Sequence, residues 1–472
     1  MLDRGPGVAG GGETRRGERR RIGVVMGRRS HTQSLSIWAN GLRVGTWSVD
    51  GRGLHALRYD PDWVQSPSGR PLSLSLPFLR GDQPHTGRTV RNYFDNLLPD
   101  SEDIRKRLAT RFRTGGVDTF DLLKAIGRDC VGAVQLLGED EVPQDTGSVR
   151  GVPMSDQGIE ALLLAAVSSS PVARHQDLEP ELRISLAGTQ DKTALLRWEG
   201  RWMLPRGSTP TTHILKPSLG HVGSRKVDFT RSVDNEWLCL RLLRAFGLPA
   251  AVARIETFES QRVLAVERFD RRASADGRQL LRLPQEDFCQ VEGRSSLEKY
   301  ESEGGPGLVD IARTLHGSID AREDLRTLLK AQLLFWMLRA PDQHAKNFSL
   351  FLLPRGRYRL TPLYDVLSAW PVMGDGANQW HRRDVKLAMA LQGKSKHDGM
   401  DHILRRHFNS TARQLGFGKD MEPVIEEVLD RVPGAIDETQ TDLPPDLSPP
   451  VVACIFEGLR VSADALRQQP PD

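Results

Sequence analysis

Apolar and polar positions alternate near the start of the folded part of the chain. From Ser34 onward the apolar residues are Leu35, Ile37, Leu42, Val44 and Trp47. The dipeptide Asn40-Gly41, which is typical of tight β-hairpin turns, interrupts them. Because neighbouring side chains of a strand point to opposite faces, this alternation predicts strands with one buried face. Residues 34–80 are therefore expected to form a small antiparallel sheet.

The spacing then changes to that of helices. Residues 91–128 place apolar side chains three and four positions apart, which predicts helices with one buried stripe. Residues 182–270 favour strands with one inserted helix, and residues 295–345 and 398–468 are mostly helical in pattern. No internal repeat is visible. The prediction is an α+β fold with a β-rich N-terminal module, a mixed α/β lobe and a mostly helical C-terminal lobe.

Composition shifts suggest where the chain divides. Residues 138–155 are polar and contain two prolines and three glycines, which is typical of a linker. We expect a disordered extension over 1–25, a β-rich N-terminal subdomain over 26–137 and a linker over 138–155. An α/β nucleotide-binding lobe over 156–270 and a helical lobe over 271–472 complete the expected division.

Overall composition excludes several classes of protein. The 472 residues are 38% hydrophobic and 27% charged, and no apolar run approaches the roughly 18 residues of a membrane span. The four cysteines lie far apart without a CxxC pair, which excludes a zinc ribbon and a disulfide scaffold. These features predict a cytoplasmic protein that does not associate with membranes.

The formal net charge of +4 is concentrated at the N-terminus. Residues 1–25 hold six arginines against three acidic residues, so the rest of the chain is almost neutral and offers little general attraction for nucleic acid. These residues are also rich in glycine and lack the apolar stretch of a signal peptide. A start at Met26 and an arginine-rich arm that contacts DNA both remain open.

A glycine turn lies early in the strand-rich region, in the segment from Arg183 to Leu196. Gly188 lets the backbone approach a phosphate closely, and the side chains of Gln190 and Lys192 add possible donors. The segment does not match the GxxxxGK[ST] loop, so a plain turn between two strands is the alternative interpretation.

Lys216 ends a short predicted strand, and Glu236 lies on the following predicted helix, beside its apolar stripe. Protein kinases hold the α- and β-phosphates of ATP with a strand lysine paired to a helix glutamate. A surface lysine and a solvated glutamate are the alternative. Farther on, residues 262–270 predict a strand and an exit segment whose backbone groups can face an adenine edge.

The most informative stretch follows an apolar helix. Asp342 and Asn347 have the D-x-x-x-x-N spacing of a kinase catalytic loop, in which the aspartate orients the attacking hydroxyl and the asparagine binds metal. A predicted hairpin over residues 348–363 returns the chain to this loop and delivers Asp365. Asn347 and Asp365 can then hold Mg²⁺ against a triphosphate. His344 is expected to brace the loop rather than to ligate metal, and zinc is not supported.

The chain resembles the HipA family of bacterial kinase toxins over roughly residues 34–459. The blocks that carry the resemblance occur in the family's order. They are Pro71–Pro77, Asn92–Pro99, Ile126–Ala133, Ser185–Lys192, Leu281–Gln290, Lys299–Gly307, His344–Ser349 and Leu360–Asp365. The resemblance implies a two-lobed, protein-kinase-like α+β fold. It also implies a serine/threonine-protein kinase that uses ATP and Mg²⁺ and acts as the toxin of a type II toxin–antitoxin module linked to persistence.

The resemblance also implies partners and residue roles. The partners would be a HipB-like helix-turn-helix antitoxin, operator DNA through that antitoxin, and a translation component such as glutamyl-tRNA synthetase as substrate. Asp342 would be the catalytic aspartate, Asn347 and Asp365 the Mg²⁺ ligands, and Ser185 the autophosphorylated serine whose modification displaces the glycine loop. Nucleotide contacts would come from Gly188, Gln190, Lys192, Lys216, Glu267, Phe269, Gln285, His344 and Lys346.

One position departs from the family. The catalytic loop commonly reads Asp-Gly-His, whereas this chain has Asp342-Gln343-His344. If that glycine has positive φ in relatives, glutamine costs about 1 kcal/mol there and the loop shifts. A degenerate kinase that acts as a DNA-bound corepressor with its antitoxin is therefore an alternative function. A small-molecule phosphotransferase is a third, against which the Ser185 loop and the β-rich module argue.

Overall fold

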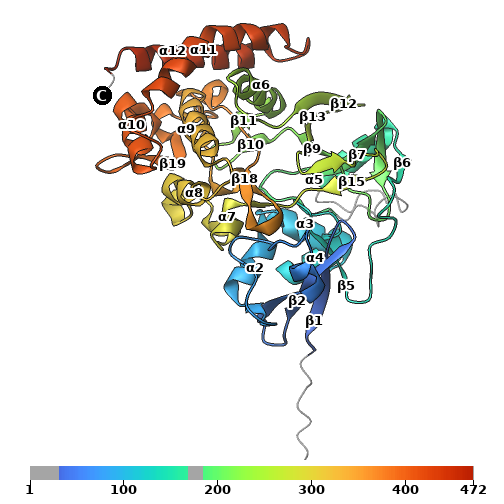
Figure 1. Cartoon of the computed structure of the whole chain (residues 1–472). Coiled ribbons are helices and arrows are strands. Elements are labelled where there is room, and N and C mark those ends of the chain that lie inside the picture. The colour runs from blue at the N-terminus through green and yellow to red at the C-terminus, as the bar shows by residue number, and fades with distance from the viewer. Residues whose placement is uncertain (1–30, 168–183, 471–472) are drawn as a thin grey trace, which may run out of the picture.

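The computed structural model describes residues 31–167 and 184–470. The predictions made for residues 1–25 and for a start at Met26 lie outside this part of the chain. Figure 1 shows a β-rich module at the bottom, a sheet-containing lobe at the right and a helical lobe at the upper left. Within the two described ranges, no helix is long and apolar enough to cross a membrane.

The N-terminal module comprises residues 33–138. Its antiparallel sheet has the order β4-β3-β2-β1-β5, and the Asn40-Gly41 turn joins β1 to β2 as expected. Four helices accompany the sheet, and Trp47 stacks on Phe94 in the core at 3.9 Å between ring centroids. The elements are β1 (Gln33–Ala39), β2 (Leu42–Val49), β3 (His55–Tyr59), α1 (Pro61–Gln65), β4 (His85–Thr86), α2 (Arg88–Asp95), α3 (Glu102–Phe112), α4 (Thr119–Ile126) and β5 (Gln135–Gly138).

The sheet lobe, residues 151–267, is built on a six-stranded antiparallel sheet of order β12-β13-β9-β7-β8-β6. The segment 138–155, expected to be a linker, contributes its edge strand β6, which pairs with β8. The elements are β6 (Gly151–Pro153), α5 (Asp156–Val167), β7 (Thr193–Trp198), β8 (Arg201–Pro205), β9 (His213–Pro217), β10 (Gly220–Val222), β11 (Val227–Phe229), α6 (Ser232–Ala245), β12 (Ala253–Phe258) and β13 (Gln261–Glu267).

In the helical lobe, residues 271–470, other elements pack around the long helix α9. The side chains of α9 are buried on nearly all faces of the helix. A three-stranded sheet of order β16-β17-β18 lies at the front of this lobe. The elements are β14 (Arg271–Ala273), β15 (Leu280–Arg282), β16 (Gln285–Asp287), α7 (Phe288–Val291), α8 (Leu308–Leu315), α9 (Ala321–Met337), β17 (Ser349–Leu352), β18 (Tyr358–Leu360), β19 (Lys386–Gln392), β20 (Lys396–Gly399), α10 (Arg405–Gln414), α11 (Glu422–Thr441) and α12 (Pro449–Arg467).

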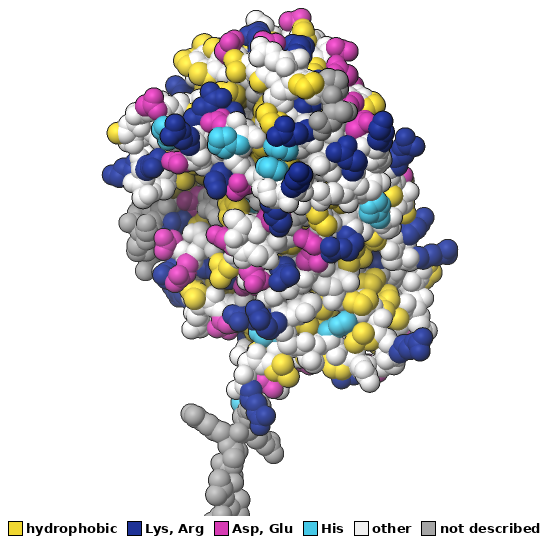
Figure 2. All heavy atoms as spheres, turned by 90° about the vertical axis from the view of Figure 1, so that its left-hand side faces the viewer, with side chains coloured by type: hydrophobic (Ala, Val, Ile, Leu, Met, Phe, Trp, Pro, Cys, Tyr) yellow, Lys and Arg dark blue, Asp and Glu magenta, His cyan; other side chains and the backbone are white. Residues whose placement is uncertain are grey.

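One hydrophobic core spans both lobes. Residues of α6 and β13 belong to the same buried cluster as residues of α9, α11 and α12. Helix α6 accordingly has buried side chains on all its faces, because the sheet packs on one side and α11 on the other. On the outside, Figure 2 shows acidic and basic side chains interspersed over the face that carries α8 and α10, in keeping with a body of little net charge.

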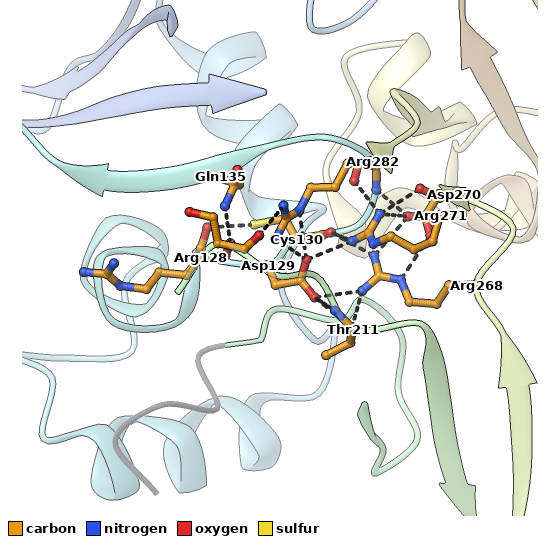
Figure 3. A network of polar contacts seen from close by, with 12 residues as sticks. Arg128, Asp129, Cys130, Gln135, Thr211, Arg268, Asp270, Arg271 and Arg282 are labelled. Atoms are coloured by element: carbon orange, nitrogen blue, oxygen red, sulfur yellow. Dashed lines mark hydrogen bonds and ion pairs between the residues drawn. The ribbon is translucent and has the colours of Figure 1, made fainter. Parts of the chain in front are cut away.

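A buried polar network joins the N-terminal module to the hinge segment, which we define as Glu267–Arg271 (Figure 3). Asp129, from the loop after α4, accepts hydrogen bonds from the Thr211 backbone at 3.0 Å and from its hydroxyl at 2.7 Å. The guanidinium groups of Arg268, Arg271 and Arg282 donate to the same carboxylate at 3.0–3.3 Å. The module therefore contacts the hinge segment through the Asp129 carboxylate and through the carbonyl groups of Cys130 and Gly132, which accept from Arg268 and Arg271.

The charges of this network depend on one another. Burial opposes ionisation of Asp129, but the three guanidinium groups outweigh it and hold the pKa of this carboxyl well below its usual range. Asp270 supplies the second carboxylate and accepts from the Gly132 backbone at 2.7 Å and from Arg268. Three cations thus share two anions in a region without solvent, so losing either anion leaves buried charge uncompensated.

Asp129→Asn is expected to destabilise the protein by about 3–5 kcal/mol, because it removes one of two anions facing three buried guanidinium groups. Thermal and urea unfolding would measure the loss. The matched control is Asp140→Asn, since Asp140 is exposed. Equal stability of the two variants would contradict the assignment.

Candidate active site

Lys216 lies at the point where the sheet lobe meets the helical lobe. It is the next-to-last residue of β9, and its side chain is buried. Its Nζ is 2.7 Å from Oε1 of Glu236 on α6 and 2.7 Å from Oδ1 of Asp365. The structure therefore contains the pair of strand lysine and helix glutamate that the sequence predicted, and it adds Asp365 to the same ammonium group.

The three charges stabilise one another's ionised forms to different extents. Burial alone would lower the pKa of Lys216, but Asp365 and Glu236 raise it above its ordinary value. Burial would raise the pKa of Asp365, but Lys216 and Lys192 lower it strongly. For Glu236, burial is the larger effect and its pKa is raised. Lys216 and Asp365 are thus a charged pair at neutral pH.

The Gly188 loop, residues 184–192, passes in front of this ion pair. Gly188 has φ of 107°, and a Cβ there would lie 2.5 Å from Nζ of Lys192, so only glycine fits. Lys192 donates to the Ala187 carbonyl at 2.8 Å, and Gln190 donates to the Pro217 carbonyl at 2.7 Å beside Lys216. Burial and the nearby Lys216 lower the pKa of Lys192 to about 8.

Ser185 lies at the buried start of the same loop. Its hydroxyl donates to the Leu97 carbonyl at 2.7 Å, and its backbone N–H donates to the Asp129 carbonyl at 3.2 Å. The Asp100 N–H donates to the Gly188 carbonyl at 3.0 Å. The N-terminal module therefore holds the loop at both ends, and Ser185 becomes accessible only when the loop leaves this position.

The Asp342 loop, residues 340–347, follows α9. The hairpin of β17 and β18 brings the chain back to it, since Tyr364 donates to the Lys346 carbonyl at 2.7 Å. The Asp342 side chain is 48% exposed, whereas most of its neighbours are buried. Asn347 donates through Nδ2 to the Asp342 carbonyl at 2.7 Å, which leaves its Oδ1 as the free group of the amide.

Asn347 and Asp365 suit Mg²⁺. Among the described residues, no group of three or more His, Cys, Asp or Glu side chains could hold a metal ion. Mg²⁺ commonly takes one or two protein oxygens together with substrate phosphates, so a carboxylate and an amide oxygen are a sufficient set.

Asp365 has φ of 61°, an unusual backbone conformation for an aspartate.

The hinge segment carries two further predicted nucleotide contacts. Phe269 packs against Phe351 and Tyr364, with ring centroids 5.8 and 5.6 Å away, and so reaches the β17–β18 hairpin. Glu267 is exposed, and its backbone N–H donates to the Val252 carbonyl at 2.8 Å. Gln285 lies on β16 and donates to Asp270 at 3.2 Å, so its amide belongs to the polar network around Asp129 and Asp270.

Lys346 belongs to a separate buried polar cluster, whereas His344 is close enough to Asp365 for their charges to interact. Lys346 contacts Asn96 at 2.7 Å and Asp287 at 3.2 Å, with Asp100 at 3.5 Å. His344 is buried, and its ring lies edge-on to the ring of Tyr300. Burial is the main cause that lowers the pKa of His344. Local sequence patterns do not indicate that Asn96, Asp100 and Asp287 surround Lys346, because these residues are far apart in the chain.

Gln343 does not have the strained geometry that its departure from Asp-Gly-His suggested. Its φ is not positive, whereas Arg339 and Asp365 nearby do have positive φ. Its Nε2 donates to the Asp365 carbonyl at 2.7 Å. The expected strain is therefore wrong for this chain: glutamine adds a hydrogen bond that supports the backbone of Asp365.

Together these observations define a class. A sheet lysine paired with a helix glutamate, a glycine loop and a D-x-x-x-x-N loop followed by a hairpin and an aspartate are the parts of a protein kinase, arranged between two lobes.

Comparison with known proteins places this kinase within one family. Residues 184–436 match the model of the HipA-like C-terminal domain, and residues 35–137 match that of the HipA N-terminal domain. The chain belongs to the HipA family.

Its relatives are of similar length. The kinase Y4mE of Sinorhizobium fredii is 35% identical over 71% of this chain and 77% of its own. The serine/threonine-protein kinase toxin HipA of Shewanella oneidensis is 26% identical over 88% of this chain and 91% of its own. The solved complex of Shewanella oneidensis HipA with HipB and operator DNA contains a chain of the same fold, with a TM-score of 0.74 and 24% identity. The match covers 92% of this chain and 97% of that chain.

Gln343→Gly is expected to destabilise the protein by about 1–2 kcal/mol, because it removes the hydrogen bond to Asp365 and adds backbone freedom. Thermal unfolding would measure this, and Gln343→Ala separates the two effects. A glycine variant more stable than wild type would show that the family's glycine suits this loop better.

Lys192→Met is expected to raise stability at pH 7, and the gain should shrink as the pH rises. Below pH 8 the folded and unfolded chains both hold the Lys192 proton, so wild type bears the full cost of the buried charge. Between about 8 and the ordinary value of 10.5 only the unfolded chain holds it, so wild-type stability rises with pH.

Urea unfolding of Lys192→Met between pH 7 and 10 would measure this dependence. Lys124→Met, at an exposed site on α4, is the matched control. A gain that stays constant with pH would show that packing, and not the charge of Lys192, is responsible.

Proposed function

We propose that this protein is the kinase toxin of a toxin–antitoxin module and transfers the γ-phosphoryl group of ATP to a serine or threonine hydroxyl of a protein. The observation that carries the proposal is the buried cluster of Lys216, Glu236 and Asp365. A hydrogen bond from Gln343 to the Asp365 carbonyl joins this cluster to the loop of the half-exposed Asp342. Family membership and the names of the relatives support it.

The residues supply what phosphoryl transfer requires, namely alignment and charge neutralisation. Lys216, held by Glu236, and Lys192 of the Gly188 loop would bind the phosphates. Asn347 and Asp365 would hold Mg²⁺, which when bound neutralises charge on the β- and γ-phosphates. Asp342 would orient the substrate hydroxyl and accept its proton.

The adenine would lie against the hinge segment. Phe269 gives an apolar surface that continues into Phe351 and Tyr364, on which the adenine ring would pack. Gln285, His344 and Lys346 would support the nucleotide site indirectly, since their contacts fix the hinge segment and the Asp342 loop.

Self-modification at Ser185 would switch the kinase off. A phosphate cannot occupy the place where the buried hydroxyl meets the Leu97 carbonyl, because the dianion would be desolvated beside an acceptor. The Gly188 loop would then leave its position on the N-terminal module, and the phosphate-binding site would be lost.

The partners follow from the family. The solved complex of the Shewanella oneidensis protein contains HipB and operator DNA. We propose a HipB-like helix-turn-helix antitoxin for this chain, operator DNA through that antitoxin, and a translation component such as glutamyl-tRNA synthetase as the phosphorylated substrate.

Wild type incubated with ATP and Mg²⁺ is expected to gain one phosphate on Ser185, and Asp342→Ala and Asp365→Ala are expected to gain none. Without Asp342 the hydroxyl is not oriented, and without Asp365 the metal is not held. Intact mass followed by peptide mapping measures the gain.

Ser185→Ala is the control for the modified position. Thermal unfolding of each variant verifies that the fold is intact. Nucleotide binding by wild type without any transfer, even to aminoacyl-tRNA synthetases, would support the corepressor function instead, and full transfer by Asp342→Ala would disprove the catalytic assignment.

A further inference from the structure

The carboxylate of Asp342 has a partner that the kinase pattern does not include. The phenol of Tyr300 donates a hydrogen bond to Oδ1 of Asp342 at 2.5 Å. Tyr300 lies 42 residues earlier in the chain, in the segment between α7 and α8. Burial and the neighbouring carboxylate raise the pKa of Tyr300 above its ordinary value, so the phenol keeps its proton.

The Tyr300 ring is fixed from two sides. The ring of His344 meets it edge to face, with centroids 4.9 Å apart and planes at 83°. The ammonium of Lys299 lies 5.5 Å from its centroid. Because His344 belongs to the Asp342 loop, Tyr300 contacts this loop both through its ring and through its hydroxyl.

The backbone around Tyr300 is equally constrained. The N–H groups of Glu303 and Gly305 donate to the Tyr300 carbonyl at 3.0 and 2.9 Å. A Cβ at Gly305 would lie 2.1 Å from the Glu298 carbonyl oxygen, so this close turn requires glycine. The phenol therefore reaches Asp342 from a rigid turn and not from a mobile loop.

Contacts with the N-terminal module extend this support. Lys299 is 3.0 Å from Asp100, whose backbone N–H donates to the Gly188 carbonyl at 3.0 Å. The Ala345 N–H donates to the Lys299 carbonyl at 3.3 Å. One turn of the module thus contacts both the Gly188 loop and the segment that carries Tyr300.

We propose that Tyr300 is a positioning residue that orients the Asp342 carboxylate toward the substrate hydroxyl. This inference rests on the proposed kinase function. The phenol occupies Oδ1 and restrains rotation about the Asp342 side chain, and the carboxylate, which is half exposed, keeps its other oxygen for the substrate proton. Tyr300 itself exchanges no proton.

The test compares Tyr300→Phe with wild type in initial rates of ADP formation and self-phosphorylation, with ATP and Mg²⁺ as the probe. Tyr300→Phe keeps the ring against His344 and removes only the hydroxyl. We expect kcat to fall by roughly 10- to 100-fold, the loss of a hydrogen bond to a charged group, while the KM for ATP stays unchanged.

Tyr358→Phe is the matched control, because the Tyr358 hydroxyl donates to the Thr314 carbonyl at 2.8 Å and does not contact Asp342. It should keep the wild-type kcat.

The other outcomes overturn the inference in distinguishable ways. An unchanged or increased kcat in Tyr300→Phe would show that the phenol does not assist Asp342, with the kinase function intact. A raised KM for ATP together with lowered thermal stability in Tyr300→Phe would show a merely structural role. No phosphoryl transfer by wild type would refute the proposed function, and the inference with it.

Discussion

The ammonium group of Lys216 is the point on which the arrangement of the two lobes depends. It comes from the sheet lobe, and its two anionic partners come from α6 and from the segment after the β17–β18 hairpin. A buried cation between two carboxylates is stable only while all three groups stay together, since separating them leaves charge without solvent. The interaction therefore couples the position of the two lobes to the assembly of the proposed phosphate-binding site.

The geometry around this ion pair also explains how the chain tolerates unusual local conformations. Asp365 has positive φ, and its carbonyl accepts the hydrogen bond from Gln343. Strain of this kind persists only where the surroundings fix the residue from several directions. Here the ammonium fixes the side chain and Gln343 fixes the backbone, so the position of one functional carboxylate is set twice.

Local sequence patterns were sufficient to predict some of these elements and residues. The alternation around Asn40-Gly41, the end of β9 at Lys216 and the stripe beside Glu236 each depend on neighbouring residues, and the structure contains these elements. Contacts between distant segments were not predictable. Lys346 contacts Asn96 and Asp100, and Tyr300 contacts Asp342, because separate parts of the fold pack together. The spacing of apolar residues along the chain does not indicate these contacts. The expected strain at Gln343 was wrong because a side-chain contact, not backbone preference, decides that position.

The network around Asp129 indicates how much of the chain forms the smallest folding unit of this kinase. The two lobes match one family model and the N-terminal module another, which invites the view that they are separable parts. Yet the guanidinium groups of Arg268 and Arg271 in the hinge segment find one of their two counter-ions in the module. A chain truncated before the Gly188 loop would carry unneutralised arginines in its interior, at the segment proposed to face adenine. The module thus supplies a counter-ion for arginines that lie inside the kinase lobes. The boundary between the two family models therefore does not separate the buried charges of the protein into two independent groups.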